Sequence, residues 1–214
     1  EWEGVRRLRT KVAGVCNING EEKGIPRKFR RSMGRVSVLA ALSAIDAVRQ
    51  SGLGEEEIAA AECGISYGST AGSTLEQVEL IGKYILNSDL TGALASSYLK
   101  CMSHTCAGNL STLFRLQGPF IASCTACVSG SQGIGFGYEA IRSGKAEIMI
   151  TGGAEEMHFL HAAVFDLMLA TSSRYNDHPS KTPRPFDAER DGLVVAEGAG
   201  TLVLEEYEHA KRRG

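Results

Sequence analysis

Apolar side chains recur at steps of three and four along residues 35–51, and Gly52 then provides a natural helix end. The members of this stripe are Val38, Leu39, Leu42, Ile45 and Val48. Such spacing predicts an amphipathic helix with one buried face. Similar patterns predict further helical segments over residues 55–62, 75–86, 93–116, 128–142 and 156–172.

Shorter apolar runs predict strands, over residues 63–67, 119–123 and 146–151. The run Ala146–Thr151 is almost continuously apolar, which is typical of a strand buried on both faces of a parallel sheet. With the helix predicted over 128–142, the last two strands form a β–turn–α–β unit. Residues 193–196 and 200–204 are predicted to pair with each other around the sequence EGAG.

The composition excludes several classes of protein. A chain of 214 residues can form one sizeable domain or two small ones. Its net charge of −2 argues against nucleic-acid binding. We find no apolar run of ~18 residues and no secretory signal, so neither a membrane span nor export is predicted. Six cysteines in this context indicate free thiols and a cytoplasmic location.

Two cysteines lie in the stretch FIASCTACVSGSQGIG, residues 120–135. The spacing of Cys124 and Cys127 permits a redox pair. Together with Cys101 and Cys106 they could form a four-thiolate zinc site, although the C-x4-C spacing is loose for one. In a third interpretation one thiol is a nucleophile, and in a fourth the thiols simply pack in the interior.

The nucleophile interpretation depends on position. A thiol at a helix N-terminus faces unpaired backbone N–H groups and the positive end of the helix dipole, which stabilise a thiolate. The same N–H groups can bind an oxyanion during acyl transfer. Cys127 has this position at the start of the helix predicted over 128–142, and Cys124 does not.

Four glycines follow within that helix, at positions 130, 133, 135 and 137. Each costs about 1 kcal/mol relative to alanine in a helix interior. We therefore expect another backbone to pack very close to this helix.

Four motifs together resemble the β-ketoacyl-acyl-carrier-protein synthases of the elongating kind: TACVSGSQGIG, GKAEIMITGGAEE, RPFDAERDG and AEGAGTLVLEEYEHAKRRG. The resemblance spans about residues 25–214. It implies an α/β thiolase-like fold with layered helices around a mixed sheet. Residues 1–214 would be a partial N-terminal ketosynthase domain, without the family's first strand and C-terminal half.

The resemblance implies an acyltransferase that carries out a decarboxylating Claisen condensation, in fatty acid or polyketide and aryl-polyene synthesis. Cys127 matches the family's nucleophile, and Cys124 is then interpreted as packing. Phe165 matches a position that lines the acyl pocket, although it could equally be an ordinary core residue. The motif residues Asp187, Arg190 and Asp191 are interpreted as structural.

The resemblance also implies partners. The family works on acyl and malonyl groups linked to the phosphopantetheine of an acidic acyl carrier protein. Lys28 and Arg31, in the basic run PRKFRR, match its carrier-docking residues, although such a run could also be a solvated face. A homodimer is implied, with the strand 119–123 pairing across the two-fold axis. No metal, cofactor, nucleic acid or membrane is expected.

Two other classes stay open. A non-catalytic chain-length factor has the same fold but usually lacks the nucleophile, so Cys127 counts against it. A thiolase-like enzyme acting on coenzyme A esters is disfavoured by RPFDAERDG and EGAG. Gln132 and Leu193 depart from the family pattern without removing the nucleophile. The family's catalytic histidines belong to its C-terminal half, so residues 1–214 alone are expected not to carry out condensation.

Overall fold

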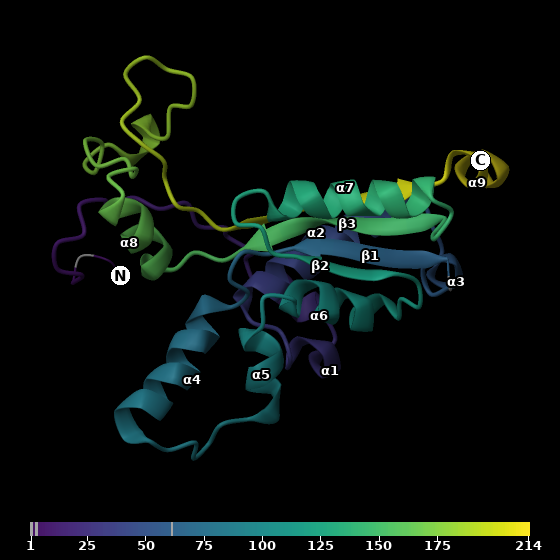
Figure 1. Cartoon of the computed structure of the whole chain (residues 1–214), viewed down its shortest axis with the longest axis horizontal. Coiled ribbons are helices and arrows are strands. Elements are labelled where there is room, and N and C mark those ends of the chain that lie inside the picture. The colour runs from purple at the N-terminus through teal and green to yellow at the C-terminus, as the bar shows by residue number, and fades with distance from the viewer. Residues whose placement is uncertain (1, 3, 61) are drawn as a thin grey trace. The chain divides into compact units, whose positions relative to one another are not determined.

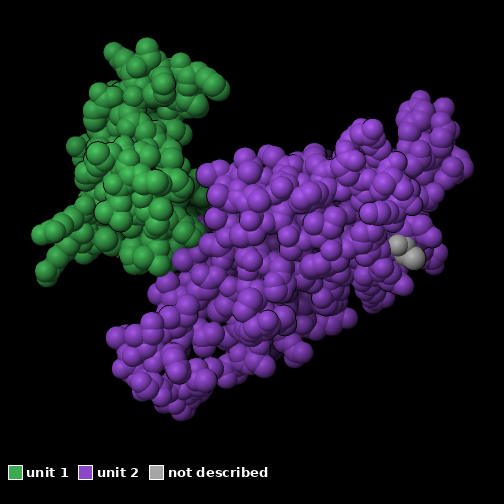
Figure 2. Space-filling view, in the orientation of Figure 1, with its two compact units in different colours: residues 1–17, 157–197 green, residues 18–156, 198–214 purple. Residues whose placement is uncertain are grey.

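The computed structural model describes residues 2, 4–60 and 62–214. They form two compact units, coloured separately in Figure 2. The small unit consists of residues 1–17 and 157–197, and the sheet unit consists of residues 18–156 and 198–214.

The sheet unit is built on a mixed sheet with the strand order β2-β1-β3-β4. The strands are β1 (Cys63–Gly68), β2 (Phe120–Ser123), β3 (Ile148–Glu155) and β4 (Gly198–Glu205). β1 runs parallel to both β2 and β3, and β4 runs antiparallel to β3. The strands on either side of the cysteine turn, β2 and β3, are thus parallel as predicted, with β1 lying between them.

The helices lie close to the predicted segments, although the apolar stripe of α4 is exposed. In the sheet unit they are α1 (Arg27–Arg30), α2 (Arg35–Ser51), α3 (Glu55–Ile58), α4 (Thr74–Asn87), α5 (Ala95–Cys101), α6 (Thr105–Phe114), α7 (Ser129–Arg142) and α9 (Tyr207–Arg213), after a short 3-10 turn, η1 (Glu21–Gly24). The small unit contains α8 (Phe159–Leu167) and a 3-10 turn, η2 (Pro179–Lys181). No helix in the described part of the chain is long and apolar enough to cross a bilayer.

Helices cover both faces of the sheet (Figure 1). Side chains alternate along β3, so that Met149 packs against α7 through Ala140, whereas Ile148 and Ile150 face the opposite side. On that opposite side the main core joins β1 to α2 and α6. The sheet is therefore a central layer, which explains the near-continuous apolar sequence of β3.

Several predicted boundaries are corrected. The segment 93–116 divides into α5 and α6, and α8 is shorter than the predicted helix over 156–172. Ala61, inside the helix predicted over 55–62, lies outside the described residues.

The predicted pairing of residues 193–196 with 200–204 is wrong. Leu193 bridges Thr171 and Ala196 bridges Gly14, whereas β4 pairs with β3. The buried strand β3 offers a complete ladder of backbone partners over eight residues, which a local pairing of the short 193–196 segment could not match.

Glu156, immediately after β3, connects two helices of the sheet unit. Its buried carboxylate accepts hydrogen bonds from Val36 N (3.1 Å) and Leu75 N (2.9 Å), in the first turns of α2 and α4. The Ser73 hydroxyl adds a third at 3.0 Å. These donors satisfy otherwise unpaired N–H groups, so the carboxylate fixes both helix starts near the end of β3.

The small unit is held together by a buried carboxylate on α8. Asp166 accepts hydrogen bonds from Arg9 N (3.0 Å) and Thr171 Oγ1 (2.6 Å). Burial alone would raise the pKa of Asp166, but these hydrogen bonds and the Arg9 guanidinium outweigh it and hold the pKa below its usual value. Asp191 accepts from Ser173 N and Arg174 N, which supports the structural interpretation of that motif.

The packing of α7 on the sheet is set by glycine. A Cβ on Gly68 of β1 would overlap the backbone of Ser129, and one on Gly153 of β3 would lie 2.8 Å from Gly130 Cα. On the helix itself, a Cβ on Gly133 would lie 3.0 Å from the carbonyl oxygen of Gly152. The predicted close backbone approach is confirmed here, but not at Gly135, whose Cβ would meet no described atom within 4 Å.

The crowded site of Gly68 and the open site of Gly135 predict opposite effects of a glycine-to-alanine substitution on stability. In the full-length protein, Gly68→Ala should lower the free energy of unfolding by about 1–3 kcal/mol, because neither backbone can move aside. Gly135→Ala, in open space on α7, should raise it by about 0.5–1 kcal/mol. Denaturant titrations of both variants test the packing. A destabilisation by Gly135→Ala as large as that by Gly68→Ala would contradict it.

Candidate active site

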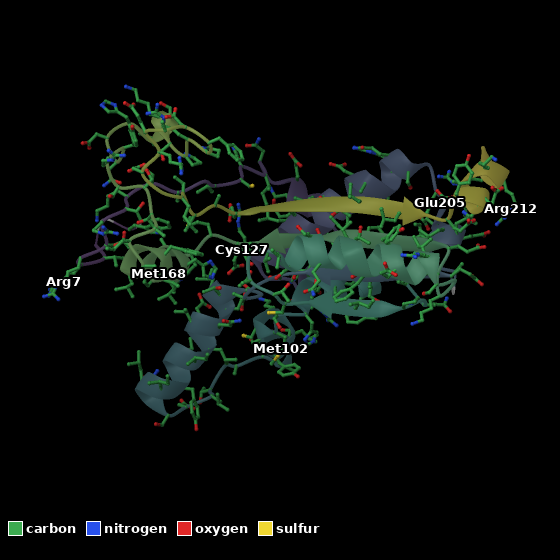
Figure 3. All side chains as sticks on the ribbon, turned by 45° about the horizontal axis from the view of Figure 1, so that its top comes forward. Arg7, Met102, Cys127, Met168, Glu205 and Arg212 are labelled. Carbon is green, nitrogen blue, oxygen red and sulfur yellow. The ribbon has the colours of Figure 1, made fainter. Side chains whose placement is uncertain are left out.

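Cys127 lies between the end of β2 and the start of α7, and its thiol is exposed (Figure 3). The helix begins at Ser129, with Val128 as its N-cap. Cys127 is therefore in the tight turn before the helix. The start at Ser129 is one residue later than the predicted start at residue 128.

The turn has an unusual backbone. Ala126 has a φ of 50°, in the left-handed region that costs a non-glycine residue roughly 1–2 kcal/mol. Ser129 stabilises this conformation from the helix side. Its backbone N–H and hydroxyl donate to Ala126 O at 3.0 and 2.7 Å, and its hydroxyl accepts from Thr125 N at 2.8 Å.

The backbone N–H groups of the turn differ in their partners. The N–H groups of Val128 and Ser129 are used within the turn, donating to Thr125 O and Ala126 O. None of the hydrogen bonds of turns and loops in the described residues has the Cys127 N–H as its donor, and Cys127 forms an isolated β-bridge with Thr125. An exposed thiol and a backbone N–H just before a helix are the two groups that acyl transfer needs, a nucleophile and an oxyanion donor.

The buried cysteines have the opposite environment. Burial raises the pKa of the Cys63 and Cys106 thiols to about 12, so both stay protonated at neutral pH. Burial also raises the pKa of Cys101. Among the residues described, no cluster of three or more His, Cys, Asp or Glu side chains could hold a metal ion.

The interpretation of Cys124 as a packing residue is wrong. Its side chain is exposed, and its thiol donates to Thr70 O at 3.2 Å. Cys124 follows β2 at the sheet edge, where the loop after β1 also begins. A polar backbone acceptor therefore replaces the apolar surroundings that packing would require.

Two residues at the same edge were not singled out from the sequence. Thr70 follows β1, and Glu155 ends β3. The Glu155 carboxylate accepts from Thr70 N (2.7 Å) and from Ser69 Oγ (3.2 Å). Because β1, β2 and β3 are parallel, their carboxyl ends meet at one edge. Polar residues at or just after the carboxyl end of each strand were the available signal.

The remaining predicted residues belong to other elements, α1 of the sheet unit and α8 of the small unit. Lys28 and Arg31 are exposed on and just after α1, which is anchored through Phe29 to the core on the face opposite α7. Phe165 lies on α8 of the small unit and is partly exposed. It does not belong to the cluster around Trp2 and Ala162 that the structure describes there.

Comparison with known proteins identifies the family. Residues 5–210 match the family model described as β-ketoacyl synthase, N-terminal domain. The chain therefore belongs to the β-ketoacyl synthase family.

Individual relatives agree with this assignment. A β-ketoacyl synthase from Burkholderia phymatum STM815 is 46% identical with a TM-score of 0.93, over 100% of this chain and 52% of that one. The 3-oxoacyl-(acyl-carrier-protein) synthase 1 of Haemophilus influenzae is 35% identical over 97% of this chain and 51% of its own length. The chain thus spans about half the length of these relatives.

A third relative is a ketosynthase solved in complex with its type II polyketide synthase acyl-carrier protein and bound to the hexaketide. It is 26% identical with a TM-score of 0.73, over 94% of this chain and 55% of that one. The predicted α/β thiolase-like fold is confirmed by these structures.

Proposed function

We propose that Cys127 is the acyl-accepting nucleophile of a β-ketoacyl-acyl-carrier-protein synthase. The observation that carries the proposal is the exposed thiol of Cys127 in the turn that leads into α7. Family membership supplies the class of reaction, and the retained cysteine argues against a chain-length factor.

The first step is acyl transfer. The Cys127 sulfur, having lost its proton, attacks the carbonyl carbon of an acyl thioester and forms a new S–C bond. The carbonyl oxygen becomes an oxyanion, which the Cys127 N–H stabilises together with a donor from the other half of the protein. The oxyanion then collapses, the bond to the donor sulfur breaks, and the departing thiolate takes up a proton.

The second step forms the carbon–carbon bond. Malonyl-carrier loses CO2, and the electron pair of the broken C–C bond becomes a carbanion on the remaining acetyl-carrier. This carbanion attacks the acyl carbonyl on Cys127, and the Cys127 thiolate leaves. The product is a β-ketoacyl-carrier, two carbons longer. Residues outside this chain would polarise the malonyl thioester, and Phe165 would line the acyl pocket.

Covalent labelling tests the nucleophile. A cerulenin-type epoxide should modify the full-length protein at Cys127, because that thiol alone combines exposure with the helix-start position. Cys127→Ala should abolish labelling, while Cys124→Ala, the matched loss of an exposed thiol three residues away, should retain it. Peptide mapping by mass spectrometry locates the adduct, and an adduct on Cys124 would overturn the assignment.

We propose further that Lys28 and Arg31 contact the carrier. Both are exposed beside the anchored Phe29, so their charges face solvent from a fixed helix. The solved ketosynthase–carrier complex of a relative supports a carrier protein as the partner. Exposed charges at the rim of such a contact act mainly on association rate and salt sensitivity.

Charge reversal tests this contact. Lys28→Glu with Arg31→Glu should raise the carrier KM about tenfold at low salt, equivalent to ~1.4 kcal/mol. Labelling of Cys127 by a small acyl mimic should not change. The matched control is Arg142→Glu with Lys145→Glu, exposed at the far end of α7 from Cys127. An unchanged carrier KM in the Lys28/Arg31 variant would place docking elsewhere.

We also propose a homodimer formed through β2. This strand is at the edge of the sheet, and Phe120 on it is exposed. Apolar side chains of α4 are exposed as well: Leu75, Val78, Ile81 and Ile85. An unpaired strand edge with an exposed Phe120, together with exposed apolar surface on α4, fits a second copy of the chain better than solvent.

The oligomeric state provides the test. Sedimentation of the full-length protein should give a dimer, and Phe120→Asp should shift it toward monomer, because two like charges would meet near the two-fold axis. Tyr207→Asp, at an exposed aromatic residue on α9, serves as the control and should leave the dimer intact. A wild-type monomer at micromolar concentration would contradict the proposal.

A further inference from the structure

The carbonyl oxygen of the peptide group between Ala126 and Cys127 is fixed by hydrogen bonds. This oxygen, Ala126 O, accepts three hydrogen bonds: from Thr70 Oγ1 at 3.1 Å, from Ser129 Oγ at 2.7 Å and from Ser129 N at 3.0 Å. Because a trans peptide is planar, its N–H points opposite to its C=O. The donors that hold Ala126 O therefore also fix the direction of the Cys127 N–H.

Of the two residues that donate to Ala126 O, Ser129 lies at the start of α7, whereas Thr70 lies in the loop after β1. Its own position is fixed, since Thr70 N donates to the Glu155 carboxylate at 2.7 Å and Thr70 O accepts from the Cys124 thiol at 3.2 Å. The preceding residue, Ser69, donates to the same carboxylate and to Ser123 O. The loop after β1 is thus tied to both β2 and β3.

This third hydrogen bond has two physical consequences. It restrains the Ala126–Cys127 peptide, which would otherwise relax away from the strained left-handed φ of Ala126. It also withdraws electron density through the carbonyl, which makes the N–H on the other side of the same peptide a stronger donor. Both effects act on the N–H of Cys127 and leave its sulfur untouched.

We infer that Thr70 is a positioning residue for acyl transfer, acting through the Ala126–Cys127 peptide on the donor that stabilises the oxyanion. The inference rests on the proposed role of Cys127 as nucleophile. Glu155 is the anchor that holds Thr70 in place. The Thr70 hydroxyl does not touch the acyl group, so its effect is confined to steps in which an oxyanion forms.

Two reactions of the Cys127 thiol distinguish a role of Thr70 in orienting the Cys127 N–H from a role in holding the turn in place. Alkylation of Cys127 by iodoacetamide displaces iodide at a saturated carbon and forms no oxyanion. Acylation of Cys127 by an acyl N-acetylcysteamine thioester passes through a tetrahedral oxyanion and releases N-acetylcysteamine. Loss of a positioned N–H slows the second reaction only, whereas a displaced thiol slows both.

The test compares three variants of the full-length protein by peptide-resolved mass spectrometry. Thr70→Val, which keeps the shape but removes the hydroxyl, should slow acylation of Cys127 at least tenfold and change alkylation less than threefold. Thr70→Ser should restore acylation. Thr112→Val is the matched control, because its hydroxyl also donates to a backbone carbonyl, Gly108 O at 2.9 Å, on α6.

The outcomes are distinct. Wild-type protein that is alkylated but never acylated at Cys127 contradicts the proposed function itself. Wild-type acylation that Thr70→Val leaves unchanged overturns the inference alone. Equal slowing of both reactions by Thr70→Val also overturns it, because Thr70 would then support only the position of the turn.

Discussion

The arrangement of the site depends on one steric constraint, the backbone contact between the first turn of α7 and the ends of β1 and β3. Gly68 and Gly153 provide strand surfaces without side chains, and Gly130 and Gly133 do the same on the helix. The first turn of α7 therefore packs directly on the ends of β1 and β3. A side chain larger than hydrogen at these glycines would separate the helix from the sheet. The cysteine turn lies at this edge of the sheet because the helix that follows it can lie nowhere else.

Polar residues at the strand ends also position the cysteine turn. The parallel strands deliver Thr70 and Glu155 to the same edge, and the carboxylate joins the loop after β1 to β3. Glu156, the next residue, fixes the starts of α2 and α4. Two adjacent carboxylates thus hold the segment between β1 and α4 at both of its ends, Glu155 at residues 69 and 70 and Glu156 at residues 73 and 75. The hydrogen bonds on Ala126 O then hold the left-handed turn before Cys127.

Much of this arrangement was predictable from local pattern. Periodicity placed α2 and α4 closely, and the near-continuous apolar run of β3 indicated a buried central strand. The helix glycines predicted a close backbone, correctly at Gly133 and wrongly at Gly135, because helix position alone does not reveal which face meets the sheet. The pairing of β4 with β3, the thiol contact of Cys124 and the role of Thr70 depend on long-range register. No short stretch of sequence contains that information.

The central claim is that Cys127 accepts an acyl group as a thioester. The most direct measurement mixes the full-length protein with an acyl-carrier protein in the absence of malonyl groups and follows both by intact mass and peptide mapping. The account predicts the mass of one acyl group on the peptide containing Cys127, hydroxylamine-sensitive as a thioester is, with one free carrier thiol released for each adduct. An acyl group on any other residue, or none on a folded protein, would contradict it.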